Sequence, residues 1–214
     1  MKRALLVASG VPPSQELLKK LWPLCELHGC ADGGYRVVRD GGWIPEILLG
    51  DFDSLAELPS AFALEKEGTS LITLPREKDL TDTEALVEEF LSLGVEEIVL
   101  TGVLGSRWDH SLANIGILER LYHRGVRGEI FGENCHIWLF GPGEHLVSKD
   151  GFAVVSLLPW TERARVSLHG FHYEITSQEL LRGTGRGVSN ILKVEEGRIF
   201  VEEGLVLLIQ SSDE

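Results

Sequence analysis

The sequence is poor in cysteine, with three such residues among 214. Cys25, Cys30 and Cys135 are odd in number and show no C-x-x-C spacing. This pattern favours neither a disulfide framework nor a zinc knuckle. A chain of this kind is typical of a reducing compartment, so we expect a cytoplasmic protein.

Long hydrophobic runs are also lacking. The apolar run at residues 4–10 is too short for the core of a signal peptide followed by a cleavage site, and far too short to span a bilayer. It is typical of a buried first strand. We therefore expect no association with a membrane.

Positive charge is scarce, because 33 acidic residues stand against 20 basic ones and give a formal net charge of -13. Such a surface repels nucleic-acid phosphates unless a local basic stripe overrides the field, and the sequence shows no such stripe. We expect no nucleic-acid partner. An anionic nucleotide can bind only where metal ions, backbone N–H groups or a few placed Arg and Lys offset the acidic field.

The chain divides into two halves with different periodicities. Its length, with 43% hydrophobic residues, allows a substantial core in one large or two small domains. Up to residue 128, short apolar runs alternate with helical patterns, which predicts a parallel sheet flanked by helices. The predicted strands are residues 3–9, 26–31, 47–50, 70–74 and 97–101, and the predicted helices are residues 14–22, 35–40, 54–67, 82–93 and 110–123.

The helix at residues 82–93 has the clearest start. Thr81 is placed to cap it, and Glu84 is placed to reach back as the partner in a capping box. Apolar residues then recur on one face of the helix.

After residue 132 the pattern changes to short β-rich runs punctuated by glycine. The predicted strands are residues 136–140, 151–158, 164–168, 187–194, 198–202 and 205–210. We therefore predict an α/β domain at residues 1–128 and an all-β domain at residues 129–214.

Aspartate recurs beyond the predicted strands of the first half, in the segments ADGG (31–34), GDFDS (50–54), KDLTD (78–82) and GSRWDH (105–110). In an open parallel sheet, ligands bind in the crevice outside the carboxyl ends of the strands, so we expect these loops to converge. Crowded carboxylates repel each other, and a divalent cation relieves that repulsion. Hard oxygen ligands suit Mg²⁺.

Three of these aspartates are candidate metal ligands. Asp51 and Asp53 flank Phe52, and both point the same way in an extended loop. Asp82, in the first turn of a helix, can hold a metal at the helix mouth. The structural alternatives stay open, because Asp51 or Asp53 can cap the following helix and Asp82 can be an ordinary N-terminal helix acid.

The remaining aspartates also have structural alternatives. Asp32 lies in an Asp-Gly turn, Asp79 can be a helix-start acid, and Asp109 can cap the next helix. Four acidic clusters, each near the carboxyl end of a strand, nevertheless exceed what capping requires.

The segment at residues 102–107 is a glycine-bearing loop that ends in Arg107 and leads into a helix. Helix N–H groups and an arginine can both face phosphate. The segment is not a P-loop, because the G-x-x-x-x-G-K-[ST] pattern is absent. We interpret Arg107 as a phosphate clamp and His110 as a surface residue at the helix start.

Taken together, these segments resemble the thiamine pyrophosphokinase family. The matching stretches, in the family's order, are ADGG at 31–34, GDFDS at 50–54, EKDLTD at 77–82, GVLGSRWDH at 102–110 and GVSN at 187–190. The combination of GDFDS with KDxTD is the specific part. Ser106 departs from the pattern, because the family commonly has a second glycine there.

The resemblance implies a Rossmann-like N-terminal domain with a parallel sheet, which binds the nucleotide and carries catalysis. It also implies a C-terminal β-sandwich for thiamine binding and dimerisation, in a homodimer with active sites between subunits. The implied reaction transfers the pyrophosphoryl group of ATP to the hydroxyl of thiamine with Mg²⁺, giving thiamine diphosphate and AMP.

The resemblance also assigns residues. Asp51, Asp53 and Asp82 match the family's metal and phosphate site, with Asp79 nearby. Asp32 and Asp109 match positions along the nucleotide and thiamine site. Ser189 and Asn190 match the C-terminal substrate-contacting pair.

For the mechanism, we expect Asp51, Asp53 and Asp82 to hold Mg²⁺ across the nucleotide phosphates. Arg107 and Lys78 would offset charge on the transferred group, since phosphoryl chemistry asks mainly for alignment and neutralisation.

For the acceptor, we expect Asp109 to orient the alcohol or take its proton. Tyr173 can stack on the pyrimidine or be an ordinary strand aromatic. Two other functions stay open: a diphosphotransferase for another heterocyclic alcohol such as a hydroxymethylpterin, and a sensor of thiamine or nucleotide without turnover.

Overall fold

The computed structural model describes residues 1–51, 61–75, 79–149 and 151–212. The chain forms two compact units, Met1–Glu133 and Asn134–Glu214. The first is α/β and the second is all-β, which confirms the predicted fold class. Within the described residues, no helix is both long enough and apolar enough to cross a membrane.

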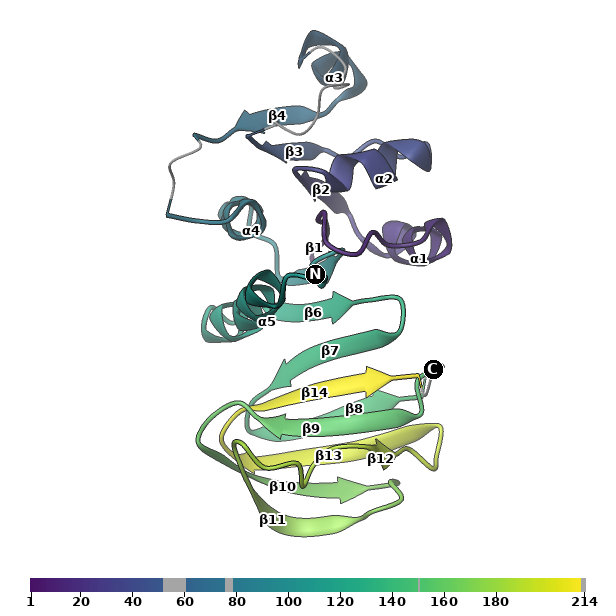
Figure 1. Ribbon diagram of the computed structural model, residues 1–214, viewed down its shortest axis with the longest axis vertical. Coiled ribbons are helices and arrows are strands. Elements are labelled where there is room, and N and C mark those ends of the chain that lie inside the picture. The colour runs from purple at the N-terminus through teal and green to yellow at the C-terminus, as the bar shows by residue number, and fades with distance from the viewer. Residues whose placement is uncertain (52–60, 76–78, 150, 213–214) are drawn as a thin grey trace. The chain divides into compact units, whose positions relative to one another are not determined.

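The first unit contains a parallel sheet in the order β6-β5-β1-β2-β3-β4 (Figure 1). Its strands are β1 (Arg3–Val7), β2 (Leu27–Ala31), β3 (Ile47–Gly50), β4 (Ser70–Thr73), β5 (Glu97–Thr101) and β6 (Arg127–Phe131). Every residue of β2, β3 and β5 is buried. Strands covered on both faces are expected to be continuously apolar rather than alternating, as these mostly are.

The predicted boundary after residue 128 falls inside β6, whereas the division between the two units follows Glu133. β6 pairs in parallel with β5 and therefore belongs to the sheet of the first unit. The sequence pattern does not predict this strand, because its five residues, RGEIF, contain only two apolar side chains.

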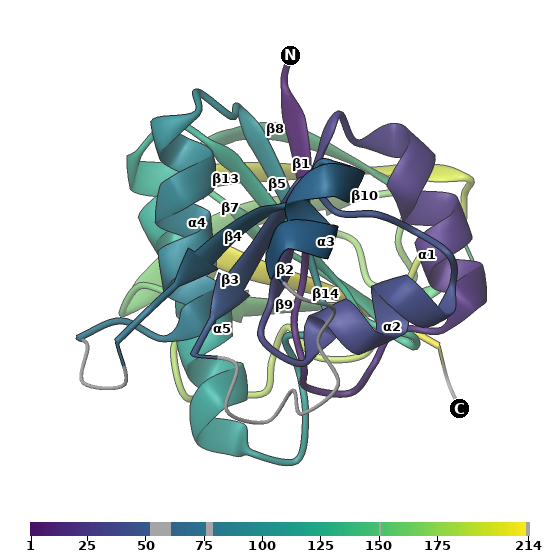
Figure 2. The ribbon, with the colours of Figure 1, turned by 90° about the horizontal axis from the view of Figure 1, so that it is seen from above.

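Helices cover both faces of this sheet. They are α1 (Gln15–Leu21), the short 3-10 helix η1 (Trp22–Leu24), α2 (Gly34–Asp40), α3 (Ala61–Glu67), α4 (Asp82–Ser92) and α5 (Trp108–His123). Figure 2 shows α1 and α2 on one face and α4 and α5 on the other. Part of the predicted helix at residues 54–67 lies outside the described residues.

The side chains explain how the two faces are filled. On one face, Leu5 and Val7 of β1 share a buried cluster with Leu18 of α1. On the other, a Cβ added at Gly29 would lie 2.8 Å from the Phe90 ring of α4. The glycine therefore allows α4 to approach the sheet closely.

The start of α4 confirms the predicted capping box. The Thr81 hydroxyl accepts a hydrogen bond from the Glu84 N–H (3.2 Å), and the Glu84 carboxylate accepts one from the Thr81 N–H (2.9 Å). Two N–H groups that a helix start leaves unpaired are thereby satisfied. The position of Asp82 as the first residue of α4 follows from this cap.

The second unit is built from two antiparallel sheets, ordered β12-β9-β14-β7 and β11-β10-β13-β8. The strands are β7 (Cys135–Phe140), β8 (Gly143–Ser148), β9 (Val154–Pro159), β10 (Arg163–His169), β11 (Ile175–Leu181), β12 (Asn190–Ile191), β13 (Glu196–Glu203) and β14 (Val206–Ser211). Side chains from both sheets, including Leu157, Val166 and Ile199, form its core. Of the predicted strand at residues 187–194, only Asn190–Ile191 forms a strand, and Leu192 adds an isolated bridge to Phe171. The positive φ of Ser189 (59°) interrupts the extended chain before Asn190.

Candidate functional site in each unit

The order of strands in the first unit reverses at β1. Strands β2, β3 and β4 extend from one side of β1, and β5 and β6 extend from the other. The chain leaving β1 leads to α1 on one face, whereas the chain leaving β5 leads to α5 on the opposite face (Figure 2). Diverging connections of this kind leave a crevice at the carboxyl ends of the two strands, where open α/β sheets bind ligands.

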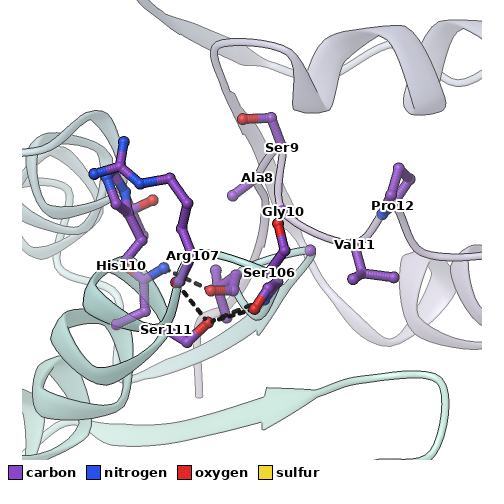
Figure 3. Close-up of a pocket in the computed structure, with 14 residues that line it drawn as sticks. Ala8, Ser9, Gly10, Val11, Pro12, Ser106, Arg107, His110 and Ser111 are labelled. Atoms are coloured by element: carbon purple, nitrogen blue, oxygen red, sulfur yellow. Dashed lines mark hydrogen bonds between the residues drawn. The ribbon is translucent and has the colours of Figure 1, made fainter.

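A cavity of about 510 Å³ lies at this crevice. It is lined by the segment after β1 (Ala8, Ser9, Gly10, Val11, Pro12), the segment after β5 (Gly102, Val103, Gly105, Ser106, Arg107), and the starts of α4 (Thr83) and α5 (His110, Ser111, Asn114). Figure 3 shows the segment that follows β1 passing beside Ser106, with Arg107, His110 and Ser111 grouped at the start of α5. The site therefore draws on segments far apart in the sequence.

Backbone contacts join the two segments that form the cavity. The Gly10 N–H donates to the Gly102 carbonyl, and the Val11 N–H donates to the Leu104 carbonyl, each over 2.6 Å. A Cβ at Gly10 would lie 2.4 Å from the Leu104 oxygen. Gly102 has a positive φ of 67°. Glycine is required at both positions, because any larger residue would separate the segments or strain the turn.

Arg107 and Asp109 form an exposed ion pair at the mouth of α5. The Arg107 Nη2 lies 2.6 Å from Asp109 Oδ2, and the Arg107 Nε lies 3.3 Å from Asp109 Oδ1. The hydrogen bond from Arg107 lowers the pKa of the Asp109 carboxyl below its ordinary value. The N-cap of α5 is Arg107 rather than Asp109, because the helix already begins at Trp108.

The structure brings Asp32 and Asp51 to the ends of neighbouring strands. Asp32 follows β2, and its N–H donates to the Leu49 carbonyl of β3 (2.8 Å). A Cβ at Gly50, which precedes Asp51, would lie 3.2 Å from the Asp32 Cα. Asp32 has a positive φ of 45°, which Asp tolerates better than most residues. Both aspartates are half-buried at the carboxyl edge of the sheet.

Asp82 lies at the same edge. It is half-buried, whereas Asp79 is exposed. The next residue, Thr83, lines the cavity, and α4 contacts β1, β2 and β3. Asp53 and Lys78 lie outside the described residues, so the structure does not place them.

A smaller cavity of about 80 Å³ lies in the second unit, with Tyr173 and Asn190 in its wall. The Asn190 side-chain amide donates to the Tyr173 carbonyl and accepts from the Tyr173 N–H, each over 2.9 Å. Ser189, in the adjoining turn, donates its N–H to the Ser156 hydroxyl (3.0 Å). Tyr173 itself is 66% exposed. The structure thus joins Asn190 to Tyr173, which are distant in sequence.

Known families match both units. Residues 18–130 match the family model described as "Thiamin pyrophosphokinase, catalytic domain", and residues 144–206 match "Thiamin pyrophosphokinase, vitamin B1 binding domain". The chain belongs to the thiamine pyrophosphokinase family. The resemblance that the sequence motifs carry is thereby confirmed.

Individual relatives agree with the family match. The chain is 30% identical over 184 residues to the thiamine pyrophosphokinase of Bacillus subtilis, covering 85% of this chain and 86% of that protein. It is 27% identical to thiamine pyrophosphokinase 1 of Arabidopsis thaliana, covering 88% and 78%. The crystal structure of the Bacillus subtilis thiamine pyrophosphokinase matches all of both chains with a TM-score of 0.86 at 27% identity.

Thiamine pyrophosphokinases are ATP-dependent diphosphotransferases, and their substrates are ATP and thiamine. The family match favours this reaction over diphosphate transfer to another heterocyclic alcohol and over a sensor without turnover. Enzymes of this family generally use a divalent metal.

The chemistry of the donor set is compatible with such a metal. Asp51 and Asp82 offer carboxylate oxygens at the carboxyl edge of the sheet, and hard divalent cations prefer oxygen ligands. Among the described residues alone, no group of three or more His, Cys, Asp or Glu is arranged to hold a metal. The predicted set of three ligands includes Asp53, which is not among those residues.

Several residues of the large cavity are not among those predicted from the sequence. Ser9 and Gly10 follow β1 directly, so their position after a strand was a usable signal. His110 is exposed, as interpreted, but it also lines the cavity. Ser111 and Asn114 gave no comparable signal, because polar residues near the start of a helix are ordinary.

Proposed function

We propose that the chain transfers the pyrophosphoryl group of ATP to the hydroxyl of thiamine, with the nucleotide phosphates held at the large cavity of the first unit. The observation that carries this proposal is the position of that cavity at the reversal of strand order between β1 and β5. Anionic groups bind well at such a point, because backbone N–H groups and a helix start face the crevice.

Charge at the cavity supports this role. The start of α5, a helix of 16 residues, contributes the partial positive charge of its N–H groups. Arg107 lines the same cavity and can clamp a phosphate oxygen, and its pair with Asp109 fixes the direction of its guanidinium. Lys78 is proposed to add a second cation.

For the metal, we propose Mg²⁺ held by Asp51, Asp53 and Asp82, with Asp79 nearby. When bound, the cation would neutralise negative charge on the phosphate oxygens. Asp32, at the end of the strand next to that of Asp51, is proposed to line the nucleotide site.

Asp109 is proposed to orient the thiamine hydroxyl. Its lowered pKa makes its carboxylate a weaker base than an ordinary aspartate, so alignment of the alcohol suits it better than removal of the proton.

The second unit is proposed to bind thiamine and to serve in dimerisation. Tyr173 offers an aromatic face for the pyrimidine ring, and Ser189 and Asn190 adjoin it. We propose a cytoplasmic homodimer with each active site between subunits. The exposure of Trp108 (76%) and Leu112 (61%), which lie one turn apart on α5, supports a partner that covers them.

The decisive experiment measures AMP release from ATP with a panel of acceptors: thiamine, a hydroxymethylpterin, and buffer alone. We expect AMP release only with thiamine, in step with the formation of thiamine diphosphate. AMP release with the pterin instead of thiamine would show that the pterin is the acceptor. Calorimetric binding of thiamine and ATP without any AMP would indicate a sensor.

A further inference from the structure

The large cavity has a feature that the proposed roles leave unexplained: two buried polar side chains on α5 bind the backbone of one loop. The Asn114 side-chain amide donates to the Val103 carbonyl over 2.7 Å. The Ser111 hydroxyl accepts from the Gly105 N–H over 3.0 Å. Asn114 is only 7% exposed and Ser111 only 4%.

The composition of the buried face of α5 makes these two residues unusual. The other buried residues of this helix are Ile117, Leu118 and Leu121, which pack as a helix face normally does. The polar exceptions occur only beside the loop at residues 102–107. Burying an amide or a hydroxyl is unfavourable unless it is hydrogen-bonded, so their partners account for their presence.

The same loop is held on its other side by the segment after β1. Gly10 and Val11 donate their N–H groups to the carbonyls of Gly102 and Leu104. Residues 102–105 are therefore fixed between two neighbours, by backbone bonds on one side and by side chains of α5 on the other.

Arg107 follows this fixed stretch at a distance of two residues. The Ser111 hydroxyl also contacts the Arg107 carbonyl (3.2 Å), so Ser111 touches both the loop and the residue at which α5 starts (Figure 3). The Arg107 side chain is 70% exposed and is held mainly by its pair with Asp109. Both members of this pair stand at the start of α5, so the placement of the guanidinium depends on the backbone there.

We infer that Asn114 and Ser111 are positioning residues for the reaction, which set the loop at residues 102–107 and the start of α5 against the nucleotide phosphates. This inference rests on the proposed nucleotide site. They act through Arg107 and through backbone N–H groups, rather than through the reacting atoms. Small displacements of such a frame weaken transfer strongly, because alignment supplies much of the rate.

The first test is the variant Asn114→Ala. We expect kcat/KM for ATP to fall by about 10- to 100-fold, since a displacement of roughly 1 Å has that effect, while KM for thiamine stays unchanged. Ser111→Ala, which removes a single hydroxyl, should act in the same direction and serves if Asn114→Ala fails to fold.

Thr69→Val is the matched control. Thr69 is 1% exposed, and its hydroxyl donates to the Pro45 carbonyl over 2.7 Å. This bond, like that of Asn114, is buried and joins a side chain to a backbone carbonyl over the same distance. It lies at the opposite end of the sheet from the cavity, before the amino ends of β3 and β4. We expect it to lower the thermal midpoint like Asn114→Ala but to leave ATP kinetics unchanged. Equal kinetic losses in the two variants would reduce the role of Asn114 to general stability and overturn the inference.

The second test combines Asn114→Ala with Arg107→Ala. If Asn114 acts through the placement of Arg107, the double variant loses less kcat/KM for ATP than the product of the two single losses. Fully multiplicative losses would refute that coupling. If Arg107→Ala impairs ATP use but the Asn114 and Ser111 variants do not, only the positioning role fails. If Arg107→Ala itself leaves ATP kinetics unchanged, the proposed nucleotide site fails, and this inference fails with it.

Discussion

Arg107 and Asp109 stand two positions apart at the start of α5, and the Arg107 guanidinium donates two hydrogen bonds to the Asp109 carboxylate. Both side chains are well exposed, at 70% and 63%. Solvent and salt screen such pairs, so the contact adds little to stability. Its physical effect is to orient the guanidinium at the cavity and to keep the carboxylate ionised.

The pair between Arg107 and Asp109 should make protonation of the Asp109 carboxyl dependent on Arg107. Because the hydrogen bond from Arg107 lowers the pKa of Asp109, the folded state binds this proton less readily than the unfolded state. The favourable contact is present above the ordinary pKa of Asp and is lost as the pH falls through the lowered value. In Arg107→Ala we expect the pKa of Asp109 to rise toward its ordinary value, as measured by carboxyl carbon NMR. An Asp109 titration that is identical in both proteins would contradict the role of the pair.

Asp82 is a proposed metal ligand, so its removal should impair catalysis. We expect Asp82→Ala to lower kcat by about 10²-fold or more, as expected when a charge-stabilising group is removed from a transition state. The unfolding midpoint should change little. Glu16→Ala is the matched control, because Glu16 is also an acid in the first turn of a helix, in α1. Full activity in Asp82→Ala would remove Asp82 from the proposed metal set.

At the scale of elements, the cap of α4 fixes where the chain re-enters the site. The capping box at Thr81 and Glu84 sets the first turn, which contains Asp82 and the cavity residue Thr83. A shift of the helix start by one residue would rotate both side chains by about 100° around the axis. The cap thus supports both stability and the direction of the carboxylate.

The contribution of this cap to stability is measurable. We expect Thr81→Ala to lower the free energy of unfolding by about 1 kcal/mol, the usual loss for an N-cap, in a urea titration. Thr81→Ser keeps the hydroxyl and should retain most of that energy. Equal losses in the two variants would show that the methyl group, rather than the hydroxyl, matters.

The elements that sequence patterns predicted are those with strong local signals. The strands β3 and β5 were predicted at their observed bounds, because short apolar runs flanked by turn residues and charges identify buried strands. The strands β8 and β11 were not predicted, because GEHLVS and ITSQELL are not continuous apolar runs, and each has only one buried residue in the structure. Pairing with β13 and β10 makes strands of these segments, and such pairing is not visible in a local window.

At the scale of the whole molecule, the proposed homodimer can be tested by complementation. Asp82→Ala alters the first unit and Asn190→Ala alters the second, and each variant alone should be inactive. If each active site is formed between subunits, random mixed dimers contain intact sites, and about a quarter of the wild-type activity should return. Light scattering gives the mass of the assembly in parallel. No recovery in mixtures that demonstrably exchange subunits would place the whole site within one chain.

The family of this protein can be inferred from its amino-acid sequence alone. The ordered motifs carry the resemblance to the family, and the aspartates beyond the strand ends predict an acidic, nucleotide-using site. These features are local, because a strand end, a cap and a motif are each encoded within a few neighbouring residues.

The position of the cavity and the contacts that hold it depend on the three-dimensional fold. The adjacency of β1 and β5 brings Gly10 to Gly102, and α5 then places Ser111 and Asn114 under the same loop. Strand order depends on which distant edges pair, and that choice is made by the packing of the whole core. No local sequence pattern encodes the strand order, so the roles of Ser111 and Asn114 could not be predicted from the sequence.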